Sequence, residues 1–295
     1  MKHIFIYIAG VIGVLVMASC EKFENDFYKP FTKETVGNTV NENVEEYIIK
    51  DIKIAGADTV FTINGVSFKM IRVEGGTFMM GSNDEEDLPS SKPVHEVTLS
   101  TYYIGETEVT QELYRAVMGS CPSSFTEKNM PAACLTYEAA FAMTEKLKDL
   151  TGFNFSLPTE AQWEYAARGG NRSHGYIYSG SDNLIKVANC HKWVGGTKIE
   201  DGNPERVSQR MANELGIYDM TGNVLEICYG WWELQYPSKP QINPLGGTHP
   251  DAWENRILRG GAYFSSSQAH RVAYRGHSSS LYIGKKCTGM RLSIW

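Results

Sequence analysis

The stretch LPTEAQWEYAARGG, residues 157–170, carries the clearest local signal for structure in the chain. Thr159 and Gln162 have the spacing of a capping box, in which the two side chains satisfy backbone groups at the start of a helix. Pro158 stops a preceding strand from running on, and Gly169 is a typical helix end. The sequence therefore predicts a short helix with a buried face of Trp163, Ala166 and Ala167.

Upstream of this helix the sequence predicts two more helices. Thr110 can cap one that ends at Gly119, and Thr136 can cap another that ends at Gly152. Both segments carry apolar residues on one face, as expected for helices that pack against a core.

Strands are predicted before these helices. The apolar residues of 60–63 and 66–68 flank Asn64-Gly65, the dipeptide typical of a hairpin with a type I′ turn. Residues 71–80 and 94–104 continue as strands on either side of an acidic loop. After residue 170, aromatic residues are spread among glycine, asparagine and serine, which predicts irregular, loop-rich structure.

Composition narrows the classes of function. The chain has 295 residues, 42% hydrophobic and 21% charged, which is ordinary for one large or two modest globular domains. The formal net charge is −6, and there is no basic stripe or recognised nucleic-acid motif. Nucleic acid is therefore not an expected partner.

The first twenty residues predict export and lipidation. Lys2 and His3 precede an apolar run over residues 4–18, too short for a comfortable membrane span but suited to a signal peptide. The run ends in VMASC, which is similar to a bacterial lipobox with Cys20 as the lipidated residue. A plain secretory signal or an uncleaved anchor helix is the alternative. A lipid on Cys20 would attach the protein to a membrane of the bacterial cell envelope. We expect the outer membrane, and the sequence does not say whether the protein is on its periplasmic or its surface face.

Domain boundaries follow from these patterns. We assign residues 1–19 to the signal peptide, 20–46 to a polar tether, 47–69 to a hairpin extension and 70–295 to the main domain. Five cysteines remain after Cys20, an odd number, so at least one is unpaired within the chain. Their ordinary interpretation is as small buried residues. They are Cys121, Cys134, Cys190, Cys228 and Cys287.

Several motifs occur together in the order of a known family. They are GGTFMMGS (75–82), PVHEVTLSTYYIGETEVTQELY (93–114), LPTEAQWEYAARGG (157–170), YSGSDN (178–183), NELGIYDMTGNVLEI (213–227) and a closing RGGAY…GMRL. In this order, over residues 70–292, they resemble the formylglycine-generating enzyme (sulfatase-modifying factor) family. The resemblance implies an irregular, loop-rich α+β fold related to C-type lectins.

The resemblance also implies calcium sites. The first would use the carboxylates of Asp219 and Glu226 and the backbone carbonyls of Gly222 and Val224. Such oxygen ligands on a tight loop suit a hard cation. The alternative is a turn in which Asp219 caps backbone groups and Glu226 pairs with an arginine. A second site would use Asn189 and the Cys190 carbonyl, with its other ligands in the unassigned stretch 192–204.

The family's oxidase chemistry depends on two cysteines that bind copper, five residues apart and just after a Gly-Gly pair. Counted from Gly260-Gly261, these positions are Ser265 and His270 here. A hydroxyl is not the soft ligand that Cu(I) needs, so copper is not expected. The tryptophan of the family's GN-x-W-E motif is likewise Leu225.

Two classes of function stay open. The first is non-catalytic binding of a protein, peptide or glycan in the groove that the family uses for catalysis, or a structural role in the envelope. The second is an enzyme with an altered site, either an oxidoreductase of the sulfatase-modifying-factor type or a non-haem iron enzyme. Serine-rich loops are also often simply solvated. The expected groove residues are Tyr263, Phe264, Ser265, His270, Arg275 and Arg291.

Overall fold

The computed structural model describes residues 49–50, 58–124, 127–190, 193–194, 197–198, 203–248, 254–279 and 286–295, all within the unit Tyr47–Trp295. The signal peptide, Cys20 and tether predicted for residues 1–46 lie outside the described residues.

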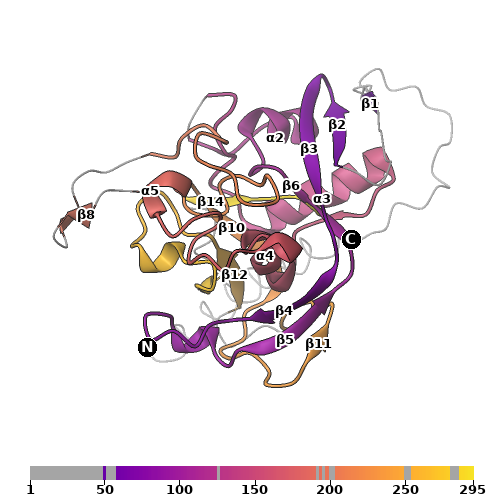
Figure 1. The fold of residues 1–295 in the computed structure, drawn as a ribbon. Helices are drawn as coiled ribbons and strands as arrows, with labels where there is room; N and C mark the ends of the chain where they lie inside the picture. The colour runs from indigo at the N-terminus through magenta and orange to yellow at the C-terminus, as the bar shows by residue number, and fades with distance from the viewer. Residues whose placement is uncertain are drawn as a thin grey trace, which may run out of the picture. The chain divides into compact units, whose positions relative to one another are not determined.

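An antiparallel six-stranded sheet forms one side of this unit (Figure 1). Its strands in spatial order are β1 (Ile49–Lys50), β2 (Thr59–Ile63), β3 (Val66–Val73), β6 (Tyr102–Gly105), β15 (Ser293–Ile294) and β7 (Phe155–Ser156). The predicted hairpin is confirmed as β2–β3, because Asn64 and Gly65 have φ values of 48° and 81°, as a type I′ turn requires. The last strand, β15, lies between β6 and β7, so the C-terminus is built into the sheet.

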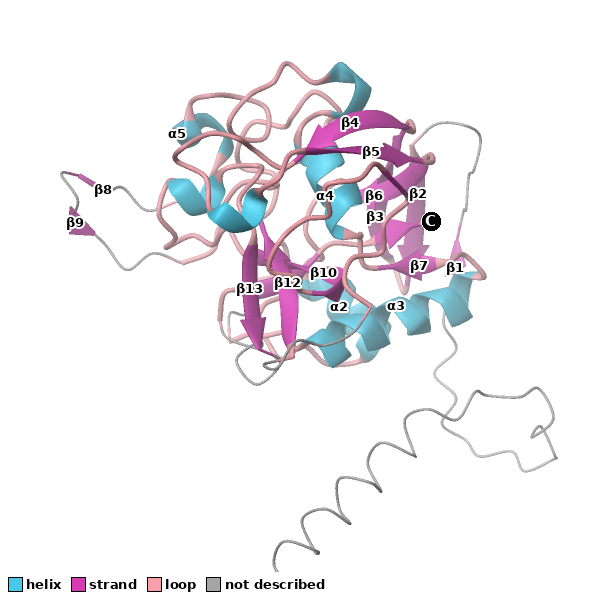
Figure 2. Cartoon of the chain, turned by 90° about the horizontal axis from the view of Figure 1, so that it is seen from below, coloured by secondary structure: helices cyan, strands magenta, loops and turns pink. Residues whose placement is uncertain are grey.

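Two helices pack side by side against this sheet, as Figure 2 shows. They are α2 (Gln111–Met118) and α3 (Tyr137–Thr151). Both predicted caps are confirmed, since the Thr110 hydroxyl accepts from the Leu113 amide at 3.2 Å and Thr136 accepts from Ala139 at 3.1 Å.

A smaller sheet and the helix at residues 160–167 form a second core. The sheet has the order β11 (Gln241–Ile242), β5 (His95–Leu99), β4 (Gly76–Met80). The predicted capping box is present at the start of α4 (Glu160–Ala167), whose eight residues are all buried. The tryptophan at 163 therefore faces the core as predicted, but so do the polar residues of this helix, which the sequence analysis missed.

The C-terminal half contains a sheet that the sequence analysis did not predict. Its order is β13 (Gly276–Ser279), β12 (Asn255–Arg259), β10 (Leu225–Trp231), β14 (Thr288–Met290), with β10 and β14 parallel. Glycines and polar residues interrupt the period-two pattern by which strands are recognised, so this sheet was expected to be loop. The remaining short elements are η1 (Pro89–Ser91), η2 (Gly170–Arg172), α5 (Leu184–Val187), β8 (Trp193–Val194), β9 (Thr197–Lys198) and η3 (Gln268–His270).

Loops join these elements over most of the C-terminal half, and helices and strands are both present. The expected class, an irregular and loop-rich α+β fold, is confirmed.

Candidate functional site

Helix α4 fixes the position of the closing segment through two buried ion pairs. Glu160 and Glu164 lie one turn apart on α4 and point at arginines from the C-terminal part of the chain. Arg275 donates to both oxygens of Glu160, at 2.7 and 2.9 Å. Arg259 donates to Glu164 at 2.5 Å. Burial alone would raise the pKa of Glu164, but the charges of Arg168 and Arg259 outweigh burial and hold that pKa below its usual value.

A third ion pair joins β10 to the end of the chain. Arg291 donates through Nε to both carboxylate oxygens of Glu226, at 3.0 and 2.9 Å, and through Nη2 to Oε1 at 2.6 Å. Trp163 adds a hydrogen bond from its indole N–H to Oε2 at 2.7 Å. Glu226 and Arg291 have no exposed surface, so each charge depends on the other. This pair locks β14 and β15 against the core.

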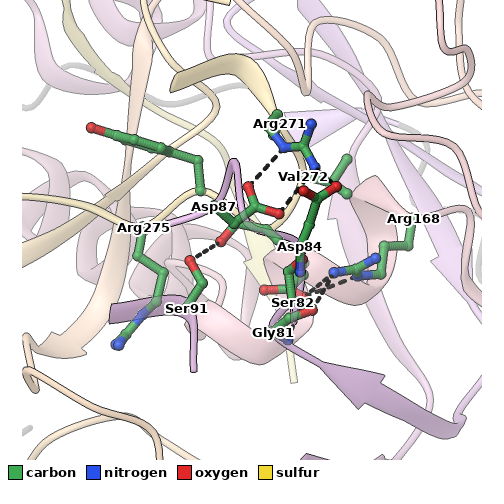
Figure 3. Close-up of polar contacts among 12 residues, drawn as sticks. Gly81, Ser82, Asp84, Asp87, Ser91, Arg168, Arg271, Val272 and Arg275 are labelled. Atoms are coloured by element: carbon green, nitrogen blue, oxygen red, sulfur yellow. Dashed lines mark hydrogen bonds and ion pairs between the residues drawn. The ribbon is translucent and has the colours of Figure 1, made fainter. Parts of the chain in front are cut away.

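The acidic loop that follows β4 is clamped to the closing segment by Arg271 (Figure 3). The Arg271 guanidinium contacts the Asp87 carboxylate at 2.7 Å, Asp84 at 2.6 Å and Glu86 at 3.1 Å. Ser91 donates its hydroxyl hydrogen to the Ala273 carbonyl at 2.8 Å. The loop is therefore held along the segment over residues 271–273.

The side chains of Ser265 and His270 are both used to shape their own loop. The Ser265 hydroxyl accepts from the Ala262 amide at 2.9 Å. The His270 ring lies with Nδ1 2.8 Å from the Ser266 carbonyl and Nε2 3.1 Å from the Ala262 carbonyl. Burial lowers the pKa of His270, although both carbonyls work in the opposite direction. Neither ring nitrogen is open to a ligand.

Comparison with known families identifies the domain. Residues 63–294 match the family described as Sulfatase-modifying factor enzyme 1-like domain. The chain belongs to this family. The match begins at the end of β2 and runs to residue 294. It includes all of the ion pairs described above.

Two relatives share about a third of their residues with the chain. The "Chaperone protein LppX" of Paenibacillus barcinonensis is 34% identical over 259 residues, covering 72% of this chain and 84% of the relative. The "Formylglycine-generating enzyme" of Streptomyces coelicolor is 30% identical over 280 residues, covering 74% and 88%. The chain is thus similar both to a protein named as a chaperone and to one named as an enzyme.

Solved structures give the same fold. "Treponema denticola variable protein 1" superposes with a TM-score of 0.68 at 27% identity, covering 81% of this chain and 99% of that one. PvdO from Pseudomonas aeruginosa superposes with a TM-score of 0.64 at 23% identity, covering 77% and 94%. At that identity the likeness to PvdO shows the fold alone.

Leu225, where the resemblance implies a tryptophan, has a packing role in this chain. It is partly buried and lies against Ala262, Tyr263 and Cys287, beside the loop that carries Ser265. An aliphatic side chain thus supports the closing segment at this position.

The expected first calcium site does not fit the residues as they lie. Both oxygens of Glu226 are taken by Arg291 and Trp163, so this carboxylate offers no open position to an ion. The turn instead has the structure given as the alternative to a calcium site. Asp219 caps a backbone group, because its carboxylate accepts from the Ser208 amide at 2.6 Å. The assignment of Glu226 as a calcium ligand is therefore corrected to an ion-pair role.

Burial disfavours the charged forms of Asp219 and of Glu108, a second carboxyl group near this turn. Burial raises the pKa of Asp219 to about 6, with the Ser208 hydrogen bond opposing the shift. Burial also raises the pKa of Glu108 well above its usual value, and the charges of Asp219 and Glu226 add to that effect. Glu108 accepts from the Asn223 side chain at 2.7 Å and from the Val224 amide at 3.0 Å. Glu108, Asp219 and Glu226 are thus three buried carboxyl groups that share Arg291 as a neighbouring positive charge.

The second expected calcium site is held together by protein contacts. The side-chain amide of Asn189 donates to the backbone carbonyl of Asn203 at 3.1 Å, and the backbone carbonyl of Asn189 accepts from the backbone amide of Asn223 at 3.1 Å. Cys190 is partly buried, and burial raises the pKa of its thiol. The stretch 192–204, which would supply the other ligands, lies largely outside the described residues. Among the described residues, no group of three or more His, Cys, Asp or Glu side chains could hold a metal ion.

The expected binding groove is only partly at the surface. Phe264 is 39% exposed and Ser265 is half-buried, as a groove residue requires. Tyr263 is 9% exposed, so most of its ring is covered. His270, Arg275 and Arg291 are buried, and each lies against hydrogen-bond acceptors in the interior. The prediction that these three residues line an open groove is therefore wrong.

Cys121, Cys134, Cys190 and Cys228 form no disulfide with one another in the structure. Cys228 and Cys287 are buried, and the other three are partly buried. Burial raises the pKa of the Cys228 thiol well above its usual value, which makes it a poor nucleophile. These cysteines act as small apolar residues, in line with the ordinary interpretation.

Proposed function

We propose that the chain is a lipid-anchored protein of the bacterial cell envelope whose domain binds a protein, peptide or glycan without oxidase chemistry. The observation that carries this proposal is the state of Ser265 and His270. At the two positions where the resemblance places copper-binding thiols, a hydroxyl accepts a backbone hydrogen bond and an imidazole lies between two backbone carbonyls. The site has been converted from reactive to structural groups.

The exposed part of the closing loop is the binding surface in this proposal. We call residues 264–268 the Phe264 tip; Phe264, Ser266, Ser267 and Gln268 are exposed around Ser265. The Phe264 ring meets Tyr263 edge to face, with centroids 5.0 Å apart. A rigid aromatic anchor surrounded by small hydroxyl groups is a composition that suits adaptable recognition surfaces. The clamp at Arg271 holds the base of the tip in place.

The relatives support a role of this kind. The Paenibacillus relative is named as a chaperone and the Treponema structure as a variable protein, and neither name describes an oxidase. No helix among the described residues is long and apolar enough to cross a membrane. In this proposal the lipid on Cys20 provides the attachment to the membrane.

Site-specific photo-crosslinking tests the binding proposal. A photoreactive amino acid at Ser266 should form a defined adduct in intact cells of the source bacterium, and Phe264→Ala should remove that adduct. The matched control is the same amino acid at Met211, which is 46% exposed. A Ser266 probe that gives no adduct beyond those of the Met211 probe would count against the Phe264 tip as a binding surface.

Metabolic labelling tests the anchor separately. Growth with a labelled fatty acid should mark the wild-type chain and leave Cys20→Ser unmarked. Cys121→Ser is the matched control and should be marked like the wild type. Unmarked wild-type protein would refute lipidation without affecting the binding proposal.

A further inference from the structure

A small cavity lies between His95, the first residue of β5, and the loop that follows β10, and no residue of the Phe264 tip lines it. Its volume is about 120 Å³. The lining that matters here consists of His95, Glu160, Trp231, Tyr236, Pro237 and Leu245. An engineered apolar cavity of about 150 Å³ in another protein binds benzene, so this volume suits one six-membered ring.

One polar group of the lining has no partner. His95 is 2% exposed, and its Nε2 atom is buried without a hydrogen bond to any described residue. Nδ1 lies 3.2 Å from the Pro93 carbonyl, which can only accept, so the hydrogen of the neutral ring is on Nδ1. Nε2 is then a bare acceptor, and a buried acceptor left unpaired is costly. The cavity therefore calls for a ligand that donates one hydrogen bond.

The buried charged groups beside the cavity, Glu160 and Arg275, are already paired with each other. Glu160 accepts from Arg275 through both oxygens and from the Tyr236 hydroxyl at 3.2 Å. The guanidinium of Arg275 is also stacked on the Tyr236 ring, 3.8 Å from its centroid. These two charged groups offer a charged ligand no open partner, whereas the Tyr236 ring and the apolar side chains of Pro237 and Leu245 favour an aromatic ring.

The cavity wall is held in shape before any ligand binds. Trp231 and Gly247 exchange two backbone hydrogen bonds of 3.1 Å across the base of the loop. The Asn243 amide donates to Thr98 on β5 at 2.9 Å. A preformed wall spares a ligand the cost of ordering the loop. Leu234 and Leu245, 74% and 45% exposed, lie on this same loop.

We propose that this cavity binds a phenolic ring. The phenol hydroxyl donates to Nε2 of His95, and the ring packs against Tyr236, Pro237 and Leu245. The phenol can be a free small molecule or the side chain of a tyrosine in a partner, for which the exposed leucines of the loop supply apolar contacts. This site is independent of the Phe264 tip.

Binding of p-cresol and toluene to the purified chain tests the proposal, because the two ligands differ by one hydroxyl group. Ligand-observed NMR should show saturable binding of p-cresol, with toluene about tenfold weaker, as expected for one hydrogen bond. His95→Phe removes the acceptor and keeps a ring, so it should remove the preference for p-cresol. His174→Phe, at an exposed histidine, is the matched control and should keep it.

Two more measurements complete the test. N-acetyl-tyrosinamide that binds like p-cresol identifies a tyrosine side chain as the ligand, and binding of p-cresol alone identifies a free phenol. The ¹⁵N resonance of His95 Nε2 should move on p-cresol binding in the wild-type chain, which keeps the test independent of variant folding. Absence of p-cresol binding, an unmoved Nε2 resonance, or a preference that survives His95→Phe would overturn the proposal.

Discussion

Replacement of Asp219 by asparagine should stabilise the domain, and the gain should depend on pH. Asp219 is 5% exposed, and burial raises its pKa from 3.8 to about 6. A shift of about 2 units corresponds to roughly 3 kcal/mol lost when this carboxyl is ionised in the folded state. Asparagine carries no charge, can still accept from Ser208, and tolerates the φ of 57° found here.

The sign follows from the raised pKa of Asp219. Stability from the protonated carboxyl is fully present below pH 3.8 and is lost as pH rises through about 6. The gain in Asp219→Asn should therefore be small near pH 4, about half complete at pH 5, and close to roughly 3 kcal/mol at pH 7. For a domain of this size that gain is a rise of roughly 6–12 °C in Tm.

Urea denaturation at a series of pH values, in chelator, measures this gain. Asp149→Asn makes the same chemical change at an exposed position and should alter the free energy of unfolding by less than about 0.5 kcal/mol at every pH. A gain at pH 7 no larger than at pH 4.5, or a loss of stability in Asp219→Asn, would refute the reasoning.

Three further outcomes are expected. Glu226→Gln leaves Arg291 buried without a carboxylate and should cost about 3–5 kcal/mol in urea denaturation; a cost below about 1 kcal/mol would show that the pair is not essential. Thr159→Ala removes the capping box of α4 and should cost about 1 kcal/mol, measured in the same way, and an unchanged midpoint would contradict the role of the cap. Millimolar calcium should leave Tm unchanged relative to chelator, because the Glu226 oxygens are occupied; a rise in Tm that Asp219→Asn abolishes would show that calcium does bind at this turn.

Local features of the fold could be predicted from the sequence. The threonine caps at residues 110, 136 and 159 and the Asn64-Gly65 turn are specified by neighbours within a few positions, so spacing alone identifies them. The family motifs then supplied the order of the elements, and the fold class followed from them.

Long-range pairing could not be predicted in the same way. Glu160 and Arg275 are 115 positions apart, and Glu226 and Arg291 are 65 apart. Nothing in the local pattern of either arginine marks it as buried, and arginines are rarely buried unless paired. For that reason Arg275 and Arg291 were placed in an open groove, whereas the structure uses them inside the core.

The central claim is that the domain keeps its family's scaffold without the family's oxidase chemistry. Its most direct test is to incubate the purified chain with Cu(I) and a cysteine peptide from a sulfatase, and to analyse the peptide by mass spectrometry. Ser265 and His270 provide no thiol pair, so no formylglycine should form, while the Streptomyces relative converts the peptide under the same conditions. Conversion by the wild-type chain that is lost in His270→Ala would contradict the account.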